Sequence, residues 1–197
     1  DDLTNPSIYQ KEVEVIIKSP GKLFPDKKIK LNCVSGLIQE ESNTYLLKPN
    51  GIGLLIPVSR ANKSDLKDQI GATDEFTAEL VWTDNKNGVK DNSNIKIVKA
   101  AGKGANGYVL VLPGSAQGNA VVAAKVGGNI IWSWHIWVSK EEPTAIGIFM
   151  DRSLGALGTT PGSADAVGLN YQWGRKDPLP KIFTVGDKGK SQAIYDS

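Results

Sequence analysis

Residues 119–139, NAVVAAKVGGNIIWSWHIWVS, indicate the fold class of this chain. Two apolar runs flank Gly127 and Gly128, a dipeptide typical of tight β-hairpin turns. Alternation in the second run gives one fully apolar face, expected in the core: Trp132, Trp134, Ile136 and Val138. The other face is mixed and is expected to meet a neighbouring segment or solvent: Ile131, Ser133, His135 and Trp137.

The same period-2 alternation recurs along most of the chain. The other strand-like runs are residues 12–18, 28–33, 44–48, 52–58, 78–83, 94–99, 107–113 and 145–150. Only residues 65–70 have a helical pattern, for little more than one turn. Many short strands separated by Gly, Pro and Asn turns are typical of a sandwich or barrel. We predict an all-β fold, an antiparallel β-sandwich with a loop-rich C-terminal extension.

Composition divides the chain into three parts. Residues 1–30 are predicted to be an N-terminal strand or linker, and residues 31–140 the sandwich. Residues 141–197 are Gly- and Pro-rich and read as a loop-rich extension, either decorating the sandwich or forming a truncated lectin-like unit. Prolines separate the strand-like part of residues 3–18 from the next strand, so its partner is not expected to be a tight hairpin neighbour. That strand is therefore expected to pair with its own sheet or to exchange between chains.

Charge and cysteine content exclude several classes of function. The 197 residues carry a net charge of +2, too mild a balance for a nucleic-acid partner. The single cysteine, Cys33, excludes an intramolecular disulfide and is expected to be a small buried hydrophobe. No apolar stretch has the length of a transmembrane helix. The chain opens with Asp1, so we expect a processed or cut form from which any export signal or lipid anchor has been removed.

Motifs that would carry catalysis, a cofactor or a metal fail on inspection. Gly102, Gly104 and Gly107 match a dinucleotide fingerprint, but a strand follows them where a helix is required. Asp84–Gly88 resembles a calcium loop with a lysine in a ligand position, and is expected to be a long hairpin turn. His135 is the only histidine, so no histidine pair can bind a metal. It is expected to be packed and hydrogen-bonded rather than a general base. We predict no catalytic residue, no metal and no cofactor.

Two polar clusters in the extension are candidate ligand-binding residues: Asp151, Arg152, Tyr171, Trp173 and Arg175. Aromatic faces of Tyr171 and Trp173 could stack on a sugar or peptide, and Arg175 could donate a planar fork of hydrogen bonds. The alternative is structural. In that case Asp151, Arg152, Arg175 and Asp177 form ion pairs among themselves and hold a loop-rich region that lacks sheet hydrogen bonds.

Three sequence blocks resemble fimbrillin-like and fimbrial-tip cell-surface proteins of the Bacteroidales type. They are WSWHIWV at residues 132–138, MDRSLGA at 150–156 and YQWGRKDP at 171–178. Ser153 stands where the family has Asn, and Asn170 where it has an aromatic residue. The resemblance implies export, localisation at the cell surface or outer membrane, and a role in adhesion or pilus-like assembly. It supplies no catalytic residue, and membrane contact only through a lipid anchor outside this chain.

The sequence therefore favours a non-catalytic adhesion or fimbria-like assembly module. Its expected partners are other surface or fimbrial subunits, a host protein or a glycan. The alternative is a carbohydrate-binding module of a surface glycan-uptake system. An enzyme is disfavoured, since a glycosidase needs two positioned carboxylates and no such pair stands out.

Overall fold

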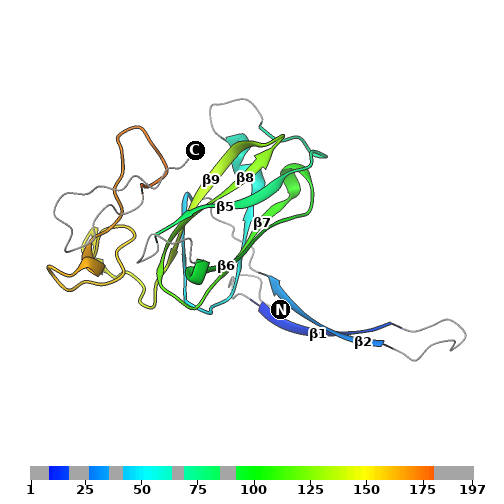
Figure 1. The fold of residues 1–197 in the computed structure, drawn as a ribbon, viewed down its shortest axis with the longest axis horizontal. Coiled ribbons are helices and arrows are strands. Elements are labelled where there is room, and N and C mark those ends of the chain that lie inside the picture. The colour runs from blue at the N-terminus through cyan, green and yellow to red at the C-terminus, as the bar shows by residue number, and fades with distance from the viewer. Residues whose placement is uncertain (1–8, 18–26, 36–41, 64–68, 85–91, 180–197) are drawn as a thin grey trace, which may run out of the picture.

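Two β-sheets packed face to face form the body of the protein (Figure 1). The computed structural model describes residues 9–17, 27–35, 42–63, 69–84 and 92–179, the first two ranges by their backbone. The four-stranded sheet has the order β3, β9, β8, β5, with bounds Thr44–Leu47, Asn129–Val138, Gly118–Val126 and Thr77–Thr83. The three-stranded sheet has the order β4, β7, β6, with bounds Leu54–Pro57, Tyr108–Pro113 and Ile95–Ala101. The predicted all-β sandwich is confirmed.

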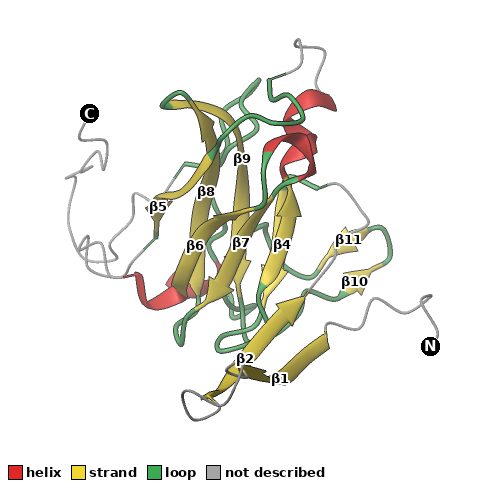
Figure 2. Cartoon of the chain, turned by 90° about the vertical axis from the view of Figure 1, so that its right-hand side faces the viewer, coloured by secondary structure: helices red, strands yellow, loops and turns green. Residues whose placement is uncertain are grey.

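The hairpin predicted at Gly127 and Gly128 is β8–β9. Its antiparallel register runs from Val126 opposite Asn129 to Gly118 opposite Val138. One strand departs from the antiparallel pattern, because β3 pairs with β9 in parallel, Thr44 lying opposite His135. The remaining pairs of both sheets are antiparallel. Figure 2 shows the strands of both sheets as overlapping layers.

The core fills the space between the two sheets. Its fully buried members come from both layers: Ile56, Val109, Val111, Val122, Trp134 and Ile136. The second face of β9 is buried as well, with Ser133, His135 and Trp137 each at most 4% exposed, because the C-terminal extension contacts it through Lys176 and Asp177. The mixed face of the Trp-rich strand therefore meets neighbouring segments, one of the two outcomes that its pattern allowed.

Trp132 is not a full member of the core, contrary to expectation. It is partly buried and packs against the core from its edge. The register of β8 and β9 shifts beside it, since Ala124 pairs with Trp132 but Lys125 pairs with Ile130. The bulge falls at Ile131, so Trp132 stays opposite the core residue Ala124 and keeps its predicted face, at the edge of the core.

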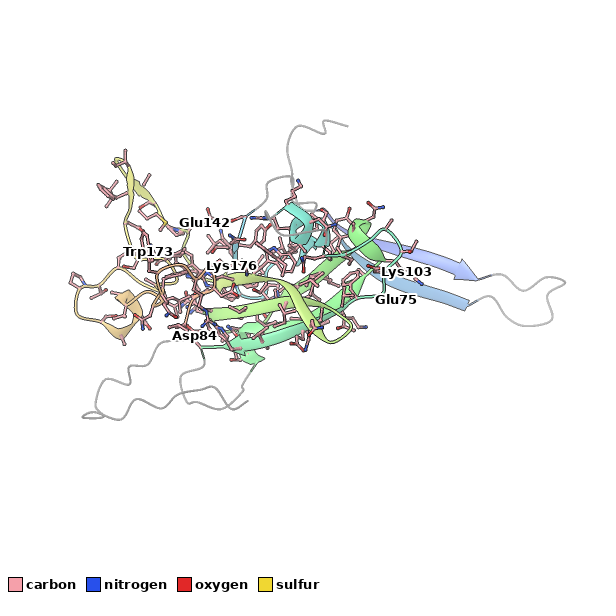
Figure 3. The ribbon with its side chains drawn as sticks, turned by 90° about the horizontal axis from the view of Figure 1, so that it is seen from above. Glu75, Asp84, Lys103, Glu142, Trp173 and Lys176 are labelled. Atoms are coloured by element: carbon pink, nitrogen blue, oxygen red, sulfur yellow. The ribbon has the colours of Figure 1, made fainter. Side chains whose placement is uncertain are left out.

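An N-terminal hairpin projects from the sandwich (Figures 1 and 3). Strands β1, Tyr9–Ile17, and β2, Lys27–Ser35, pair antiparallel over their full length, from Tyr9 opposite Ser35 to Ile17 opposite Lys27. The expectation that the first strand lacks a hairpin neighbour was wrong, and β2 belongs to this hairpin rather than to either sheet of the sandwich. Exchange of β1 between chains stays a prediction. The side chain of Cys33 lies outside the described residues.

Three other local expectations change. Residues 145–150 form a small hairpin of β10, Ala145–Ile146, and β11, Phe149–Met150, instead of one strand. Strands β5 and β6 lie in different sheets, and of the predicted hairpin turn Asp84–Gly88 only Asp84 is among the described residues. Most of the predicted helix at 65–70 lies outside the described residues. The described helices are short 3-10 turns: η2 Val58–Lys63, η3 Asn92–Asn94, η4 Gly104–Asn106 and η5 Ala164–Ala166.

The Gly-rich motif 102–107 connects β6 to β7 through η4, and a strand follows it as predicted. The described part of the C-terminal extension, residues 141–179, lies at the end of the sandwich opposite the β1–β2 hairpin (Figure 1). It contains β10, β11 and η5, joined by loops.

Candidate functional site

Asp151 and Arg152 form a tight ion pair with each other. Arg152 Nε donates to Asp151 Oδ1 over 2.8 Å, and Nη2 donates to Oδ2 over 3.0 Å. Thr144 Oγ1 donates to the same carboxylate over 2.9 Å. The hydrogen bonds from Arg152 hold the pKa of Asp151 well below its usual range. The side chain of Arg152 is only 4% exposed, so this pair braces the base of the β10–β11 hairpin rather than presenting a charge to solvent.

Tyr171, Trp173 and Arg175 lie on one closed loop, residues 170–179. An isolated bridge between Asn170 and Leu179 closes the loop, with Leu179 N donating to Asn170 O over 2.8 Å. At its tip, Arg175 N donates to Gln172 O over 3.0 Å, which makes a β-turn with Trp173 and Gly174 at its corners. Gly174 has φ +78°, a conformation that this turn position requires and that glycine adopts without strain. The turn presents the Trp173 side chain outward, and it is 99% exposed.

The loop 170–179 is anchored on β9 by its last residues. Lys176 Nζ donates to Ser133 O over 2.9 Å and to Asp177 Oδ1 over 2.7 Å, and it also contacts Ser133 Oγ. Ser133 Oγ donates to Asp177 Oδ2 over 2.6 Å. Tyr171 is hydrogen-bonded to Thr44 on β3, and burial raises its pKa to about 12. Tyr171 remains 43% exposed. These contacts fix the loop at both of its ends while its tip stays open.

Two cations lie over the ring of Trp132. The guanidinium carbon of Arg60, on η2, is 4.5 Å from the ring centroid, and Lys176 Nζ is 4.6 Å from it. Burial lowers the pKa of Lys176; Asp177 opposes this, and Arg60 and Arg175 lower it further. Cation–π attraction accounts for the presence of the cations beside an indole.

His135 is the centre of a buried polar network. Asn119 Nδ2 donates to Asp84 Oδ2 over 2.6 Å and to Gly155 O over 2.9 Å, which leaves Asn119 Oδ1 as an acceptor. His135 Nε2 therefore donates to that oxygen over 2.9 Å, and Nδ1 accepts from Thr44 Oγ1 over 3.3 Å. Burial lowers the pKa of His135 to about 4, an effect that Asp177 opposes. The imidazole is neutral at pH 7, and both of its nitrogens are bound within the protein.

The structure divides the predicted site in two. Asp151 and Arg152 pair with each other beneath the β10–β11 hairpin, whereas Tyr171, Trp173 and Arg175 sit on the loop 170–179. Sequence motifs did not predict the site roles of Arg60, Asn119 and Ser133, which make several of the contacts between these parts. Their residue types carry no periodic or spacing signal. Asp84 was visible in a calcium-like run, but its carboxylate instead accepts from the Asn119 side chain.

The three sequence blocks meet in space. The first is most of β9; the second reaches it through the Asn119 bond to Gly155, and the third through Ser133 and Lys176. Comparison with protein-family models, with curated proteins and with solved structures found no match to this chain. The fimbrillin-like resemblance therefore rests on the blocks themselves.

Within the described ranges, no group of three or more His, Cys, Asp or Glu side chains is placed to hold a metal ion. In that same part of the chain, no helix has the length and apolar character needed to cross a bilayer.

Proposed function

We propose that this chain is a non-catalytic adhesion or fimbria-like assembly module of an exported cell-surface protein, and that its C-terminal extension is the binding surface. The partners would be other surface or fimbrial subunits, a host protein or a glycan. The cell-surface location follows from the resemblance of the three sequence blocks. The choice of surface follows from where the molecule exposes its apolar side chains.

Exposed apolar side chains gather on the extension, and this observation carries the proposal. The β10–β11 hairpin exposes Ile146, Ile148, Phe149 and Met150, with Ile148 at 93% and Phe149 at 72%. Val167, Tyr171 and Trp173 add to them from the loops. Contiguous apolar surface on a soluble domain marks a place where another molecule binds, because exposing it to water costs free energy.

The extension is held firmly enough to present that surface. Backbone hydrogen bonds tie Leu169 to Leu154 and Asp151 to Thr144, each over 2.9 Å. Side-chain bonds tie Gly155 to Asn119 and Lys176 to Ser133. A surface fixed in advance loses little conformational entropy when it binds. The sandwich thus acts as the scaffold and the extension as the contact.

Bead adhesion tests this proposal. Beads carrying the chain should bind cultured epithelial cells or immobilised matrix proteins, and an Ile148→Ser/Phe149→Ser double variant should bind far less at an unchanged melting temperature. Ile130→Ser, which removes a 51% exposed apolar side chain from β9 outside the extension, is the matched control. Equal binding by the double variant would reject the extension as the contact. Surface labelling of expressing cells tests the location separately.

Carbohydrate binding is the second candidate, and the tip of the loop 170–179 favours it. Aromatic rings that stand open to solvent can stack on the apolar face of a sugar. Trp173 and Tyr171 are both exposed on one anchored loop. A glycan array probed with the chain and with Trp173→Ala tests this function, since loss of every signal on the variant supports it and retention of every signal rejects it.

A further inference from the structure

Arg60 and Lys176 lie at the ring of Trp132, and Arg175 precedes Lys176 on the loop 170–179; we refer to these three residues as the cationic cluster. Arg60 and Lys176 both lie over the indole ring, at 4.5 and 4.6 Å from its centroid. Arg175 is close enough to act on the charge of Lys176. The cluster joins two segments far apart in sequence, η2 and the loop 170–179.

Two cations of the cluster, Arg60 and Lys176, lie against the same ring. Asp177 is the carboxylate that pairs with Lys176, over 2.7 Å. Arg60 contributes a second cation, and its Nε is buried without a hydrogen-bond partner among the described residues. Like charges held together repel each other, and they do so more strongly where water is partly excluded. An incoming anion would relieve this repulsion.

Aromatic surface adjoins the cluster on the same loop. Trp173 stands three positions before Lys176, across the turn that exposes its ring, and Tyr171 lies at the start of the loop. In Figure 3, Lys176 lies against the sandwich and Trp173 farther out on the extension. A planar guanidinium binds carboxylate or sulfate oxygens in pairs, and an open indole accepts the apolar face of a sugar ring. A ligand with both features is an acidic saccharide.

We propose that the cationic cluster, together with the exposed ring of Trp173, binds a carboxylated or sulfated saccharide. This inference rests on the proposed binding function of the extension and names the chemical class of one of its ligands. The anionic group would meet Arg60 and Arg175, and the neighbouring sugar ring would stack on Trp173. Lys176 holds the loop to Ser133, and its positive charge adds to the attraction of the anionic group.

Calorimetric titration of the full chain tests the site with four probes: an oligogalacturonate, a heparin hexasaccharide, maltohexaose and polyglutamate. The two acidic saccharides should bind, each more weakly as salt rises. Arg60→Gln/Arg175→Gln should weaken that binding about tenfold or more, since each charge-assisted hydrogen bond contributes at least that factor. Trp173→Ala should weaken it as well. Lys176 is left intact because it anchors the loop.

Lys103→Gln is the matched control. It removes one positive charge, paired with Glu75, at the end of the sandwich away from Trp173 (Figure 3). It should leave binding of the acidic saccharides unchanged. That result would show that the loss of binding in the arginine variant comes from the cationic cluster and not from the lower net charge of the chain. Circular dichroism and melting temperature check that each variant is folded. If Arg60→Gln lowers the melting temperature, Arg175→Gln alone serves, because its side chain lies in an exposed residue.

The outcomes separate this inference from the proposed function. Maltohexaose binding that depends on Trp173 but not on the arginines would overturn the acidic class and leave carbohydrate binding intact. If polyglutamate binds as tightly as the acidic saccharides, the proposal that the ligand is a saccharide is overturned, and an acidic polypeptide is indicated instead. Absence of binding to all four probes would overturn the inference, while bead adhesion through the β10–β11 hairpin would still report on the proposed function.

Discussion

His135 Nε2 donates a hydrogen bond to Asn119 Oδ1 over 2.9 Å, so the one histidine of the chain is fixed by its neighbour in the sheet. The same Asn119 side chain reaches Asp84 and the carbonyl of Gly155. A single amide therefore connects the end of β5, the centre of β9 and the C-terminal extension. Stability and the attachment of the extension are linked through this residue.

Stability should fall on acidification through His135. Its pKa is about 4 in the folded protein, against an ordinary value of 6.5. The unfolded chain therefore binds more protons between these two values, and the stabilisation is complete above pH ~6.5 and is lost as the pH falls toward 4. The full effect is about 3 kcal/mol at most. Urea denaturation at a series of pH values measures it, and His135→Gln should flatten the profile between pH 4 and 6.5; an equally steep profile in that variant would contradict this assignment.

Asn119→Ala should loosen the extension as well as destabilise the fold. It removes one hydrogen bond each from the Asp84 carboxylate, the His135 ring and the Gly155 carbonyl, and losing a buried hydrogen bond of this kind costs about 1–3 kcal/mol. Amide hydrogen exchange should show the largest loss of protection in residues 154–169. Uniform loss of protection over the whole sandwich, with none confined to the extension, would argue against the linking role.

The two tryptophans at the start of β9 should respond differently to truncation. Trp134→Ala should cost about 3–5 kcal/mol, as deletion of a large core aromatic does, because Trp134 is fully buried. Trp132→Ala should cost less in global unfolding, but it removes the ring beneath Arg60 and Lys176. Limited proteolysis should then cut the loop 170–179 more readily. Equal losses of unfolding free energy for both variants would contradict the different burial of the two rings.

Gly104 and Gly127 allow the same substitution to be compared in two environments. Both have positive φ, +55° and +58°, which asparagine tolerates. A Cβ at Gly104 would lie 2.1 Å from Ala72 O, whereas nothing lies within 4 Å of one at Gly127. Gly104→Asn should therefore cost about 3 kcal/mol through overpacking, and Gly127→Asn should stay within about 0.5 kcal/mol. Thermal melts of the two variants make the comparison, and similar shifts would reject the packing argument.

Alternation predicted most of the strands, because each strand of a sandwich buries one face and leaves a period of two in the sequence. The β8–β9 hairpin was predicted with its turn. Pairing across long distances was not, since nothing local to Thr44 indicates that it lies parallel to His135. Alternation also fails for residues 145–150, where the side chains of both short strands are exposed and no core imposes a pattern on them.

The candidate site was predicted in part. Asp151, Arg152 and the aromatic residues of the loop 170–179 stand out in the sequence because they interrupt a Gly-rich region. Their separation into a buried ion pair and an open loop depends on which sandwich residues they meet. Arg60 and Ser133 decide this, and each is an unremarkable residue in its own segment. Contacts between distant segments are set by the packing of the sheets, which local sequence does not encode.

The exposure of Trp173 gives the molecule an optical probe of its own binding surface. Of the five tryptophans, Trp134 and Trp137 are buried and Trp82 and Trp132 are partly buried, while Trp173 alone is fully exposed. Its emission should lie at longer wavelength than that of the others and should be quenched first by iodide. A ligand that covers this ring would shield it from the quencher and leave the remaining fluorescence unchanged. Occupancy of the loop 170–179 can therefore be followed without any attached label.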